Sequence, residues 1–577
     1  MSRFTDQMYG SAATSARGLI TGPVDAPVRR SWGEIHERAR LTAGALANAG
    51  VGPGSVVAVL AGDPAEVAPL AQAVWMRSAA ITMLQQPTPR TDLAIWLANT
   101  DRAASTIGAS IIVVGSPFDA AAAPLAAAGH RVLTIDDVRN GPAIAPLHTG
   151  GSAIAMYQLT SGSTGVPKAV QLTHANLLAN SVALMAATEC DASKDVMVTW
   201  LPLSHDMGMI AFLTLPMQLG IELVAATPDE FLRRPAVWPE LITRYRGAIT
   251  CGPNFAYAML ALTLEHAGPG EYDLSSLRVA INGAEPIDAP AVHRFAEAGA
   301  RFGLRQRAIT PAYGMAEATL AVTFDTSPQI NVDVISRSDL DERGIATPNT
   351  GADARSVVSV GHPVVGMEVR VVDDESRPKP PRHVGSIEVR GAAVSRGYLT
   401  EHGWLDGPIR DGWLCTGDLG YLDEHGTLYV CGRAKDVIVV AGINIYPTDI
   451  ERAACAVPGV RAGNAAAVRI DDCTGPESFA VLAESKLADD PAEAERIREE
   501  VALRVSQAVG YYARSVLILP PGSLPKTLSG KLQRGKAAEL FASIEAQAAC
   551  VNGSAPGDPT PAHLHLTTPA LGKQDAL

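Results

Sequence analysis

The 577-residue sequence has little that would suit a metal cluster, a disulfide framework or a nucleic-acid surface. Its seven cysteines stand singly, with no Cys-x-x-Cys pair and no histidine pair beside them at metal-ligand spacing, so no zinc site is indicated. Isolated cysteines fit a reducing compartment best. The formal net charge of −13 argues against a basic nucleic-acid surface. An anionic ligand must therefore be held locally, by loops and individual cations.

Long apolar runs are also missing. No stretch approaches the length of a membrane span, and residues Met1 to Gly18 are polar and lack the apolar core of a secretory signal. The hydrophobic fraction of 47% and the charged fraction of 19% are still those of a folded globular protein. We therefore expect a cytoplasmic protein without a membrane span, and the length predicts two or more domains.

Helix-like and strand-like segments alternate along the first part of the chain, which predicts an α/β fold with parallel sheets covered by helices. Helices are predicted at residues 33–49, 64–76 and 117–128, and strands at 55–60, 110–114 and 131–135. Later strands, predicted at 248–251, 277–281 and 306–310, each run into a polar motif. Ligands in open α/β sheets bind beyond the carboxyl ends of strands, so these motifs are expected to share one crevice.

The chain changes character between Gly432 and Tyr446, where four apolar residues followed by Gly442 predict a hairpin that opens a new domain. A small mixed domain follows, with helices predicted from 447 and at 491–508 and strands at 463–468, 479–483 and 516–519. The last thirty residues or so are rich in Pro, Ala, Gly and Thr, which predicts a disordered tail. His563 and His565 in that tail could bind a metal only adventitiously.

Residues 160–168 read Thr-Ser-Gly-Ser-Thr-Gly-Val-Pro-Lys and follow an apolar run at 153–159 that predicts a strand. Glycines let backbone N–H groups approach an anion, hydroxyls add donors or reach a metal, and Lys168 adds a positive charge. The loop is a candidate phosphate site, and Thr173 could cap the next helix. It is not the common P-loop, because Ala169 rather than Ser or Thr follows the lysine. A solvent-exposed turn is the structural alternative.

Five further polar motifs lie downstream. They are residues 282–286 (Asn-Gly-Ala-Glu-Pro), 312–319 (Ala-Tyr-Gly-Met-Ala-Glu-Ala-Thr), 413–420 (Trp-Leu-Cys-Thr-Gly-Asp-Leu-Gly), 432–436 (Gly-Arg-Ala-Lys-Asp) and 524–534 (Leu-Pro-Lys-Thr-Leu-Ser-Gly-Lys-Leu-Gln-Arg). We interpret each as a turn-like motif at the end of an apolar run. In this order the set resembles the signature motifs of the adenylate-forming superfamily, which includes acyl-CoA synthetases, luciferases and peptide-synthetase adenylation domains. The resemblance covers roughly residues 30–540.

The resemblance implies a ligase that uses ATP and Mg²⁺ to convert a carboxylate into acyl-AMP with release of pyrophosphate. Such a reaction depends on positioning and on neutralising phosphate charge. It also implies a large N-terminal AMP-binding domain of parallel and mixed sheets covered by helices (residues 1–434), a small mobile α+β domain (435–546) and the tail (547–577). The residues implied around the phosphates are Thr160, Ser161, Gly162, Ser163, Thr164, Gly165 and Lys168.

Roles of other single residues follow from the same resemblance. Glu317 matches the acidic residue near Mg²⁺, with Thr164 as its hydroxyl partner, and oxygen ligands suit that hard cation. Tyr313 matches the aromatic that stacks on adenine. The other residues implied around the nucleotide are Gly283, Ala284, Glu285, Gly314, Met315, Asp418, which accepts from the ribose hydroxyls, and Arg433, a second ribose or phosphate contact.

Two lysines complete the implied machinery. Lys531 matches the mobile lysine that bridges the carboxylate and the α-phosphate. Lys435 matches the hinge about which the small domain rotates between two half-reactions. Each residue has a structural alternative: Tyr313 as core, Asp418 in a turn, and either lysine as a surface charge.

Three features resemble the fatty acyl-AMP ligases more than the acyl-CoA ligases. Residues 200–208 resemble their acyl-pocket motif and contain His205, a catalytic candidate, and Met207; residues 252–257 resemble a second marker and contain Asn254 and Phe255. The third feature is a polar stretch, Asp325 to Arg355, longer than the usual link by roughly a strand and a turn. In acyl-AMP ligases such an insertion docks the mobile domain, although a neutral surface loop is an alternative.

One departure lies after Gly442, where Ile443-Asn444-Ile445 lacks the Arg and His that many acyl-AMP ligases carry. The sequence hypothesis is a fatty acyl-AMP ligase of lipid biosynthesis that transfers its acyl group to the phosphopantetheine thiol of an acyl carrier protein or a polyketide-synthase carrier domain. A medium- or long-chain acyl-CoA synthetase is the alternative, because it shares every residue of the first half-reaction. An inactive nucleotide-binding homologue is a third, of another class.

Overall fold

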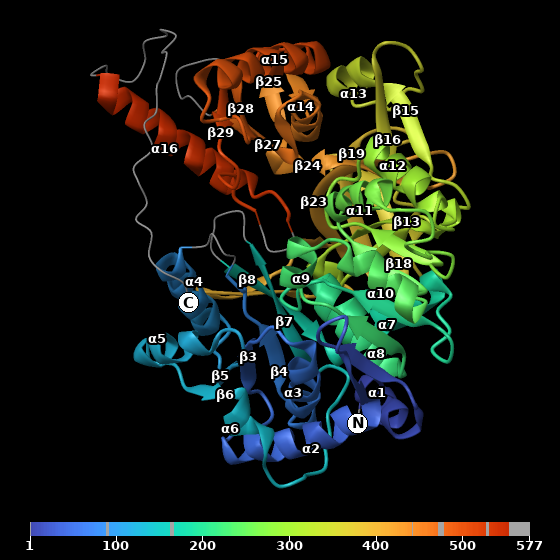
Figure 1. Cartoon of the computed structure of the whole chain (residues 1–577), viewed down its shortest axis with the longest axis vertical. Helices are drawn as coiled ribbons and strands as arrows, with labels where there is room; N and C mark the ends of the chain where they lie inside the picture. Colours follow the sequence, from blue (N-terminus) through green and yellow to red (C-terminus); the bar gives the residue numbers. More distant parts are fainter. Residues whose placement is uncertain are drawn as a thin grey trace. The chain divides into compact units, whose positions relative to one another are not determined.

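The computed structural model describes residues 2–87, 92–161, 167–440, 442–470, 478–526 and 530–552 (Figure 1). Contacts divide the chain into two units. The first comprises Met1–Lys435 with Thr527–Lys531, and the second comprises Asp436–Lys526 with Leu532–Leu577. Within the residues that the structure describes, four clusters of buried apolar side chains each lie within one unit.

A nine-stranded mixed sheet forms one part of the first unit. Its inner strands β1 and β9–β13 are parallel, and β2, β14 and β17 pair antiparallel at the edges. In spatial order the strands are β17 (His362–Pro363), β14 (Ala321–Phe324), β13 (Ile309–Gly314), β12 (Val279–Asn282), β11 (Ile249–Gly252), β9 (Val196–Thr199), β10 (Glu222–Ala225), β1 (Gly18–Thr21) and β2 (Val28–Ser31).

An eight-stranded sheet forms a second part. Its order is β21 (Gly403–Asp406), β20 (Gly397–Thr400), β8 (Pro167–Thr173), β7 (Ile154–Ser161), β4 (Ala80–Met83), β3 (Val56–Leu60), β5 (Ile111–Val114) and β6 (Val132–Thr134). Strands β3–β7 are parallel, whereas β7 and β8 form an antiparallel pair that ends at Ser161 and Pro167. The candidate phosphate loop therefore connects two paired strands.

Helices cover these sheets, and Figure 1 shows α3 beside the strand β4, with α2 packed against α3. Their starts carry clear capping signals. Ser31 and Glu34 form a capping box at α2, Asp63 precedes Pro64 at α3, and Thr173 caps α7 as predicted. The helices are α1 (Arg3–Thr14), α2 (Trp32–Asn48), α3 (Pro64–Met76), α4 (Leu93–Thr106), α5 (Ala122–Ala127), α6 (Ile135–Arg139), α7 (His174–Thr188), α8 (Leu215–Leu219), α9 (Pro228–Arg233), α10 (Val237–Tyr245), α11 (Asn254–His266) and α12 (Ala289–Ala300), with short 3₁₀ turns η1 (Asp119–Ala121), η3 (Gln306–Ala308) and η4 (Ala316–Ala318).

A five-stranded antiparallel sheet completes the first unit, with β18 (Met367–Val372), β19 (Gly385–Gly391), β23 (Trp413–Leu422), β22 (Ile409–Arg410) and β24 (Leu428–Arg433). The predicted insertion is larger than the expected strand and turn. It forms β15 (Val332–Ser336), α13 (Arg337–Arg343) and β16 (Ala354–Val358), and β15 and β16 pair antiparallel from Val332↔Val358 to Ser336↔Ala354.

Polar side chains fasten this insertion to the five-stranded sheet. Asp333 Oδ2 accepts hydrogen bonds from Tyr421 Oη at 2.7 Å and from Arg382 Nη1 at 2.9 Å. Arg382 Nη1 also donates to the carbonyl oxygen of Ala346 at 3.0 Å. Asp353 Oδ2 accepts from Ser336 Oγ at 2.9 Å and so ties both ends of the α13 segment together. These bonds make the insertion an ordered element and not a loose surface loop.

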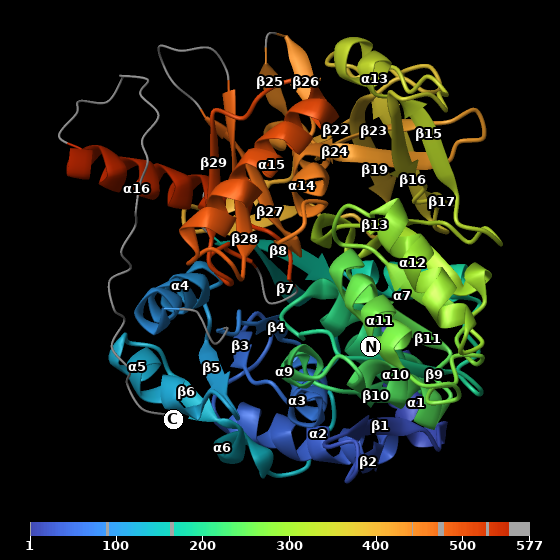
Figure 2. The same cartoon turned by 45° about the horizontal axis from the view of Figure 1, so that its top comes forward.

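The second unit begins at the hairpin predicted after Gly432. In Figure 2 its helices α14 and α15 lie beside the strands β27 and β28. Its elements are β25 (Ile438–Val440), β26 (Ile443–Ile445), α14 (Pro447–Cys455), β27 (Val460–Ile470), β28 (Ser478–Ser485), α15 (Pro491–Val509), β29 (Ser515–Leu519) and α16 (Arg534–Asn552). The turn η5 (Ala434–Asp436) spans the boundary between the units.

The α/β class predicted from the sequence is confirmed, whereas several local expectations need correction. The strand predicted at 306–310 begins only at Ile309, after a 3₁₀ turn, and continues to Gly314. The motif at 413–420 is a strand and not a turn, because β23 pairs with both β19 and β24. Finally, α16 continues to Asn552, into the segment predicted to be a disordered tail.

Candidate active site

Three residues implied around the nucleotide meet where β13 approaches β23 and β24. Tyr313 Oη donates to Asp418 Oδ2 at 2.6 Å, and Arg433 Nε lies 3.3 Å from Asp418 Oδ1. Asp418 and Arg433 are cross-strand neighbours in the β23–β24 ladder. Burial, and then the charge of Asp418, raise the pKa of Tyr313. The phenol therefore stays protonated and donates, and Asp418 is a nearly buried carboxylate with lone pairs left for another donor.

A second group joins Glu317, Lys168 and Tyr398. Tyr398 Oη donates to Glu317 Oε1 at 3.0 Å, and Lys168 Nζ lies 5.6 Å from the centre of the Tyr398 ring. Tyr398 lies on β20, which pairs with β8 next to Lys168. The sequence reasoning missed Tyr398, because no polar motif surrounds it and the contact exists only after β20 pairs with β8.

Glu317 offers a single carboxylate at a 3₁₀ turn, and its backbone oxygen accepts from Ser395 N at 2.7 Å. In the described part of the chain no group of three or more His, Cys, Asp or Glu residues could hold a metal ion. One carboxylate fits Mg²⁺, which proteins commonly bind through one or two carboxylates together with substrate phosphates and water. Thr164, its expected partner, lies outside the described residues.

The structure describes only the two ends of the candidate phosphate loop. Thr160 and Lys168 are paired across β7 and β8, and Thr160 Oγ1 donates to the carbonyl oxygen of Lys168 at 3.3 Å. Ser161 is the last residue of β7. The predicted residues Gly162, Ser163, Thr164 and Gly165 lie outside the described residues.

Close backbone packing shapes the segment from Gly283 to Glu285 and the neighbouring turn. A Cβ on Gly283 would lie 2.9 Å from the carbonyl oxygen of Ala312, and Ala284 has a left-handed φ of 68°. Glu285 Oε1 accepts from Phe255 N at 2.7 Å, which ties this segment to the start of α11. A Cβ on Gly314 would lie only 2.0 Å from the carbonyl oxygen of Leu320, so a side chain cannot fit there.

The acyl-pocket candidates lie on α11 and on a π-helix, η2 (Met207–Thr214). His205 Nδ1 lies 2.6 Å from Asp206 Oδ1, which also accepts from Met207 N at 2.8 Å. Burial alone would raise the pKa of Asp206, but His205, these hydrogen bonds and the charge of Lys531 lower it on balance. Asp206 is a second residue that the sequence reasoning missed, although it directly follows His205. Asn254 Oδ1 accepts from Asp288 N at 3.2 Å, which ties the start of α11 to the start of α12.

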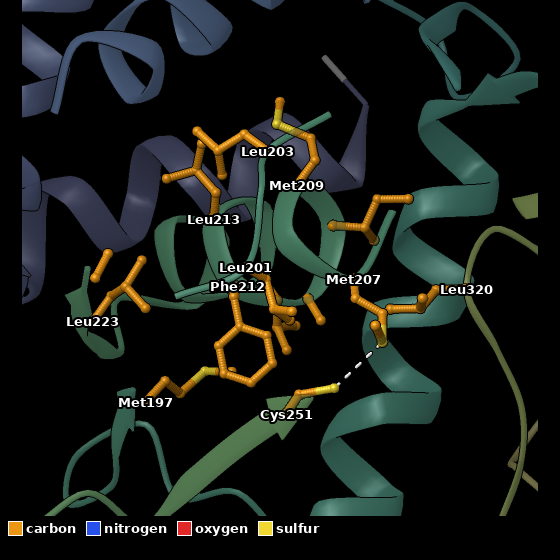
Figure 3. Close-up of a cluster of buried hydrophobic side chains, with 14 of the residues drawn as sticks. Met197, Leu201, Leu203, Met207, Met209, Phe212, Leu213, Leu223, Cys251 and Leu320 are labelled. Carbon is orange, nitrogen blue, oxygen red and sulfur yellow. Dashed lines mark hydrogen bonds between the residues drawn. The ribbon is translucent and has the colours of Figure 1, made fainter. Parts of the chain in front are cut away.

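An apolar, sulfur-rich cluster surrounds the start of the π-helix (Figure 3). Cys251 Sγ donates to Met207 Sδ at 3.4 Å, and Figure 3 shows Phe212 and Met197 near the same cysteine. A Cβ on Gly208 would lie 2.2 Å from the carbonyl oxygen of Pro202, so this tight turn requires glycine. Methionine side chains adapt their shape readily, which suits the close packing of this buried cluster.

The segment with Lys531 groups with the first unit. A Cβ on Gly530 would lie 2.3 Å from the Phe255 ring, so the backbone at Gly530 packs closely against that ring. Burial lowers the pKa of Lys531, and Arg433 lowers it further, while Asp418, Glu285 and Asp206 raise it. The structure thus brings Lys531 into one electrostatic environment with Asp418, Arg433 and Glu285. Lys435 is the last residue of the first unit before the chain enters the second.

The family model of AMP-binding enzymes matches residues 12–399. The chain belongs to this family. Among its relatives, a protein of Mycobacterium tuberculosis named as a ligase is 50% identical over 542 residues, which is 94% of this chain and 100% of the relative. A 4-hydroxyphenylalkanoate adenylyltransferase of Mycobacterium marinum is 32% identical, covering 89% of this chain and 85% of the relative. A medium-chain-fatty-acid–[acyl-carrier-protein] ligase of Moorena producens is 36% identical, covering 66% of each chain.

A solved structure from work on fatty acyl-adenylate ligases of E. coli and L. pneumophila has the same fold as this AMP-binding enzyme. Its TM-score is 0.86 at 28% identity, and it covers 95% of this chain and 98% of that one. These comparisons confirm the sequence-based assignment to the adenylate-forming superfamily and to its acyl-adenylate-forming ligases. In the described ranges, no helix of this enzyme is both long enough and apolar enough to cross a membrane.

Proposed function

We propose that this enzyme activates a fatty acid with ATP, forms acyl-AMP and pyrophosphate, and transfers the acyl group to the phosphopantetheine thiol of an acyl carrier protein. The observation that carries the first half is the shared environment of Lys531, Asp418, Arg433 and Glu285. This environment supports a role for Lys531, a partly buried cation, in meeting the α-phosphate of a nucleotide held by Asp418.

In this proposal the nucleotide is held at three points. The Tyr313 ring stacks on adenine, while Asp418, already oriented by Tyr313 Oη, accepts from the ribose hydroxyls. Lys168 and the loop before it contact the β- and γ-phosphates. Mg²⁺, when bound at Glu317, neutralises phosphate charge. Tyr398 orients the Glu317 carboxylate through its 3.0 Å hydrogen bond.

Lys531 then acts on the reacting groups. Its ammonium draws the substrate carboxylate and the α-phosphate together and stabilises the charge that shifts to pyrophosphate. Burial and then the charge of Arg433 lower the pKa of Lys531, whereas Asp418, Glu285 and Asp206 raise it. Lys531→Ala should therefore lower the rate of acyl-AMP formation by on the order of a hundred- to a thousandfold while ATP binding persists. If Lys531→Ala formed acyl-AMP at the wild-type rate, Lys531 would have no role in the reaction.

The proposal that the acceptor is a carrier protein rests on a different observation. The insertion β15–α13–β16 is ordered and is anchored at Arg382 and Tyr421. A rigid element there supports the acyl-AMP ligase reading, in which the insertion disfavours the use of free CoA. The ligase of Moorena producens, whose name gives a carrier protein as acceptor, adds support. The acyl-CoA synthetase alternative uses the same adenylation residues.

The test incubates the protein with ATP, Mg²⁺ and single acids, and identifies products by mass spectrometry. The panel contains fatty acids of increasing length and a 4-hydroxyphenylalkanoate, each with no acceptor, with CoA, or with a phosphopantetheinylated carrier protein. We expect acyl-AMP from fatty acids, and thioester on the carrier but little acyl-CoA. Efficient acyl-CoA formation supports the synthetase alternative. Activation of only the aromatic acid overturns the fatty acid assignment, and no pyrophosphate release with any acid indicates an inactive homologue.

A further inference from the structure

The loop that carries Lys531 has a neck built within the second unit. Gln533 N donates to the carbonyl oxygen of Pro525 at 2.9 Å, and Lys526 and Leu532 form an antiparallel bridge. Lys526 Nζ also donates to the carbonyl oxygen of Gly463 at 2.8 Å. The chain therefore enters and leaves the Lys531 loop at one closed point.

Arg534 stands directly after this neck and is bound from two sides. Its Nε and Nη2 donate to Glu451 Oε1 and Oε2, both at 2.7 Å, which is the bidentate arrangement that best fixes a guanidinium. Its Nη1 donates to Asp436 Oδ2 at 3.2 Å. The side chains of all three residues are less than a quarter exposed.

The two carboxylates come from distinct parts of the second unit. Glu451 lies on α14, and its Oε1 also accepts from Ala467 N on β27 at 3.2 Å. Asp436 is the first residue of the second unit and directly follows Lys435. Arg534 thus connects the neck of the Lys531 loop to the body of the unit and to the residue after the candidate hinge.

We propose that Arg534 is a positioning residue for adenylation, which clamps the Lys531 loop to Asp436 and Glu451 so that any rotation about Lys435 moves Lys531 as part of one rigid body. The inference rests on the proposed function, because it assumes that Lys531 must reach the α-phosphate. Arg534 itself does not contact the substrate in this mechanism. It works by keeping Lys531 at a fixed distance from the hinge.

The roles of the two carboxylates can be separated. Asp436→Asn weakens the link to the hinge and leaves the pairing with α14, whereas Glu451→Gln weakens the bidentate link and leaves the hinge contact. If the Arg534 ion pairs only stabilise the fold, both variants and Arg534→Lys should lose activity only in proportion to their loss of stability. A clamp predicts that adenylation falls without loss of folding, and that Arg534→Lys, which keeps the charge but not the fork, recovers part of the rate.

The experiment compares Arg534→Met with Arg496→Met, which removes another arginine of the same unit, bound to Glu493 and Glu500 on α15. We expect Arg534→Met to lower kcat for acyl-AMP formation about ten- to a hundredfold, as misplacement of a reacting group does, with KM for ATP unchanged. Arg496→Met should match the wild type. Melting temperatures of both variants are measured alongside.

A second readout needs no catalysis. Amide hydrogen exchange of residues 530–537, which include the Gln533 amide of the neck, should be faster in Arg534→Met by about tenfold and unchanged in Arg496→Met. Unchanged exchange and kcat in Arg534→Met would overturn the clamp, as would equal losses in both variants. If the wild type forms no acyl-AMP, the proposed function fails, and the exchange result still decides whether Arg534 holds the neck.

Discussion

Tyr398 links the candidate metal ligand to the candidate phosphate lysine through one side chain, and two substitutions separate these contacts. Tyr398→Phe removes the hydrogen bond to Glu317 and keeps the ring beside Lys168, whereas Tyr398→Leu removes both. One hydrogen bond is worth about 1 kcal/mol, so we expect the Phe variant to need about fivefold more Mg²⁺ for half-maximal adenylation. KM for ATP at saturating Mg²⁺ should rise only in the Leu variant. An unchanged Mg²⁺ requirement in the Phe variant would show that the phenol does not orient Glu317.

Asp418 is the residue whose charge matters most for nucleotide binding in the proposed mechanism. Asp418→Asn keeps the shape and an acceptor for Tyr313 but removes the charge that the ribose hydroxyls meet. We expect ATP affinity, measured by calorimetry, to fall by about 1.5–3 kcal/mol. Tyr313→Phe is the matched control, because it retains the ring and the Asp418 charge and loses the phenol's hydrogen bonds to Asp418 and to Met315 Sδ. If Asp418→Asn bound ATP with wild-type affinity, Asp418 would not be the residue that binds the ribose.

His174 gives the fold a dependence on pH that is independent of catalysis. The side chain is buried at the start of α7, where Nδ1 lies 3.0 Å from Ser2 Oγ and the ring packs edge-on against Phe4. Burial lowers its pKa from 6.5 to about 4. Below pH 6.5 His174 is protonated in the unfolded chain but stays neutral in the folded chain, and this difference favours unfolding. The stability that the neutral His174 gives the fold is therefore complete above pH 6.5 and is lost progressively towards pH 4.

We expect the free energy of unfolding to fall by up to about 3 kcal/mol over that interval on account of His174. Urea denaturation of the wild type and of His174→Gln at pH 7.5 and pH 5 tests this, and the variant should show the smaller difference. His402→Gln serves as the control, because the His402 side chain is 88% exposed. Equal pH dependence in all three proteins would contradict the assignment.

At the scale of elements, the insertion can be shortened without breaking its ladder. Ser336 and Ala354 form the last pair of β15 and β16, so an Asn-Gly turn in place of residues 337–353 converts the element into a plain hairpin. We expect acyl-CoA formation to rise, because a differential contact of about 1.4 kcal/mol changes a two-state ratio tenfold. Adenylation should persist, since the removed segment contains none of the site residues.

A control for that deletion keeps the segment and removes one anchor: Arg382→Met removes the hydrogen bonds to Asp333 and Ala346 and leaves the one from Tyr421 to Asp333. A loosened insertion should give an intermediate acyl-CoA yield. If the wild type already makes acyl-CoA efficiently, or if the hairpin variant makes no more than the wild type, the insertion does not govern the acceptor.

Sequence patterns predicted elements well where the information is local. Helix α3 follows from Asp63, Pro64 and the apolar run to Met76, and the cap at Thr173 follows from a hydroxyl placed before a helical segment. Sequence patterns failed to predict the secondary structure of segments that become strands only by pairing with strands distant in the sequence. Asp418 looks like a turn residue beside Gly417, yet β19 and β24 pair with its segment from both sides and make it a strand.

The candidate site shows the same limit. Its motifs could be recognised in the sequence because each is a distinct run of polar residues. The pairing of Asp418 with Arg433 brings two of these motifs together. Tyr398 and Asp206 were not found, because a tyrosine in a strand and an aspartate after a histidine are ordinary in sequence. Only the approach of β20 to β8, and the turn before the π-helix, gives them chemical partners.

At the scale of the whole molecule, the two units have separate cores, which predicts two steps of unfolding. In the described part of the chain, four buried clusters each draw their residues from a single unit. Differential scanning calorimetry should therefore resolve two transitions. ATP should raise mainly the transition of the first unit, which holds Tyr313 and Asp418, because a ligand stabilises the state that binds it. Phe479→Ala, in the core of the second unit, should lower only the other transition. A single transition that shifts as a whole would show that the units unfold together.

The way the insertion is fastened also limits how it can be exchanged between enzymes. Asp333 lies inside it, but its two partners, Arg382 and Tyr421, lie far downstream in the chain. A segment of residues 325–358 transplanted into a related synthetase would therefore carry Asp333 but lack its hydrogen-bond partners Arg382 and Tyr421. Recombination at this locus, in the laboratory or in evolution, has to move three separate stretches of the gene together before the recipient inherits a shaped element and not merely extra length.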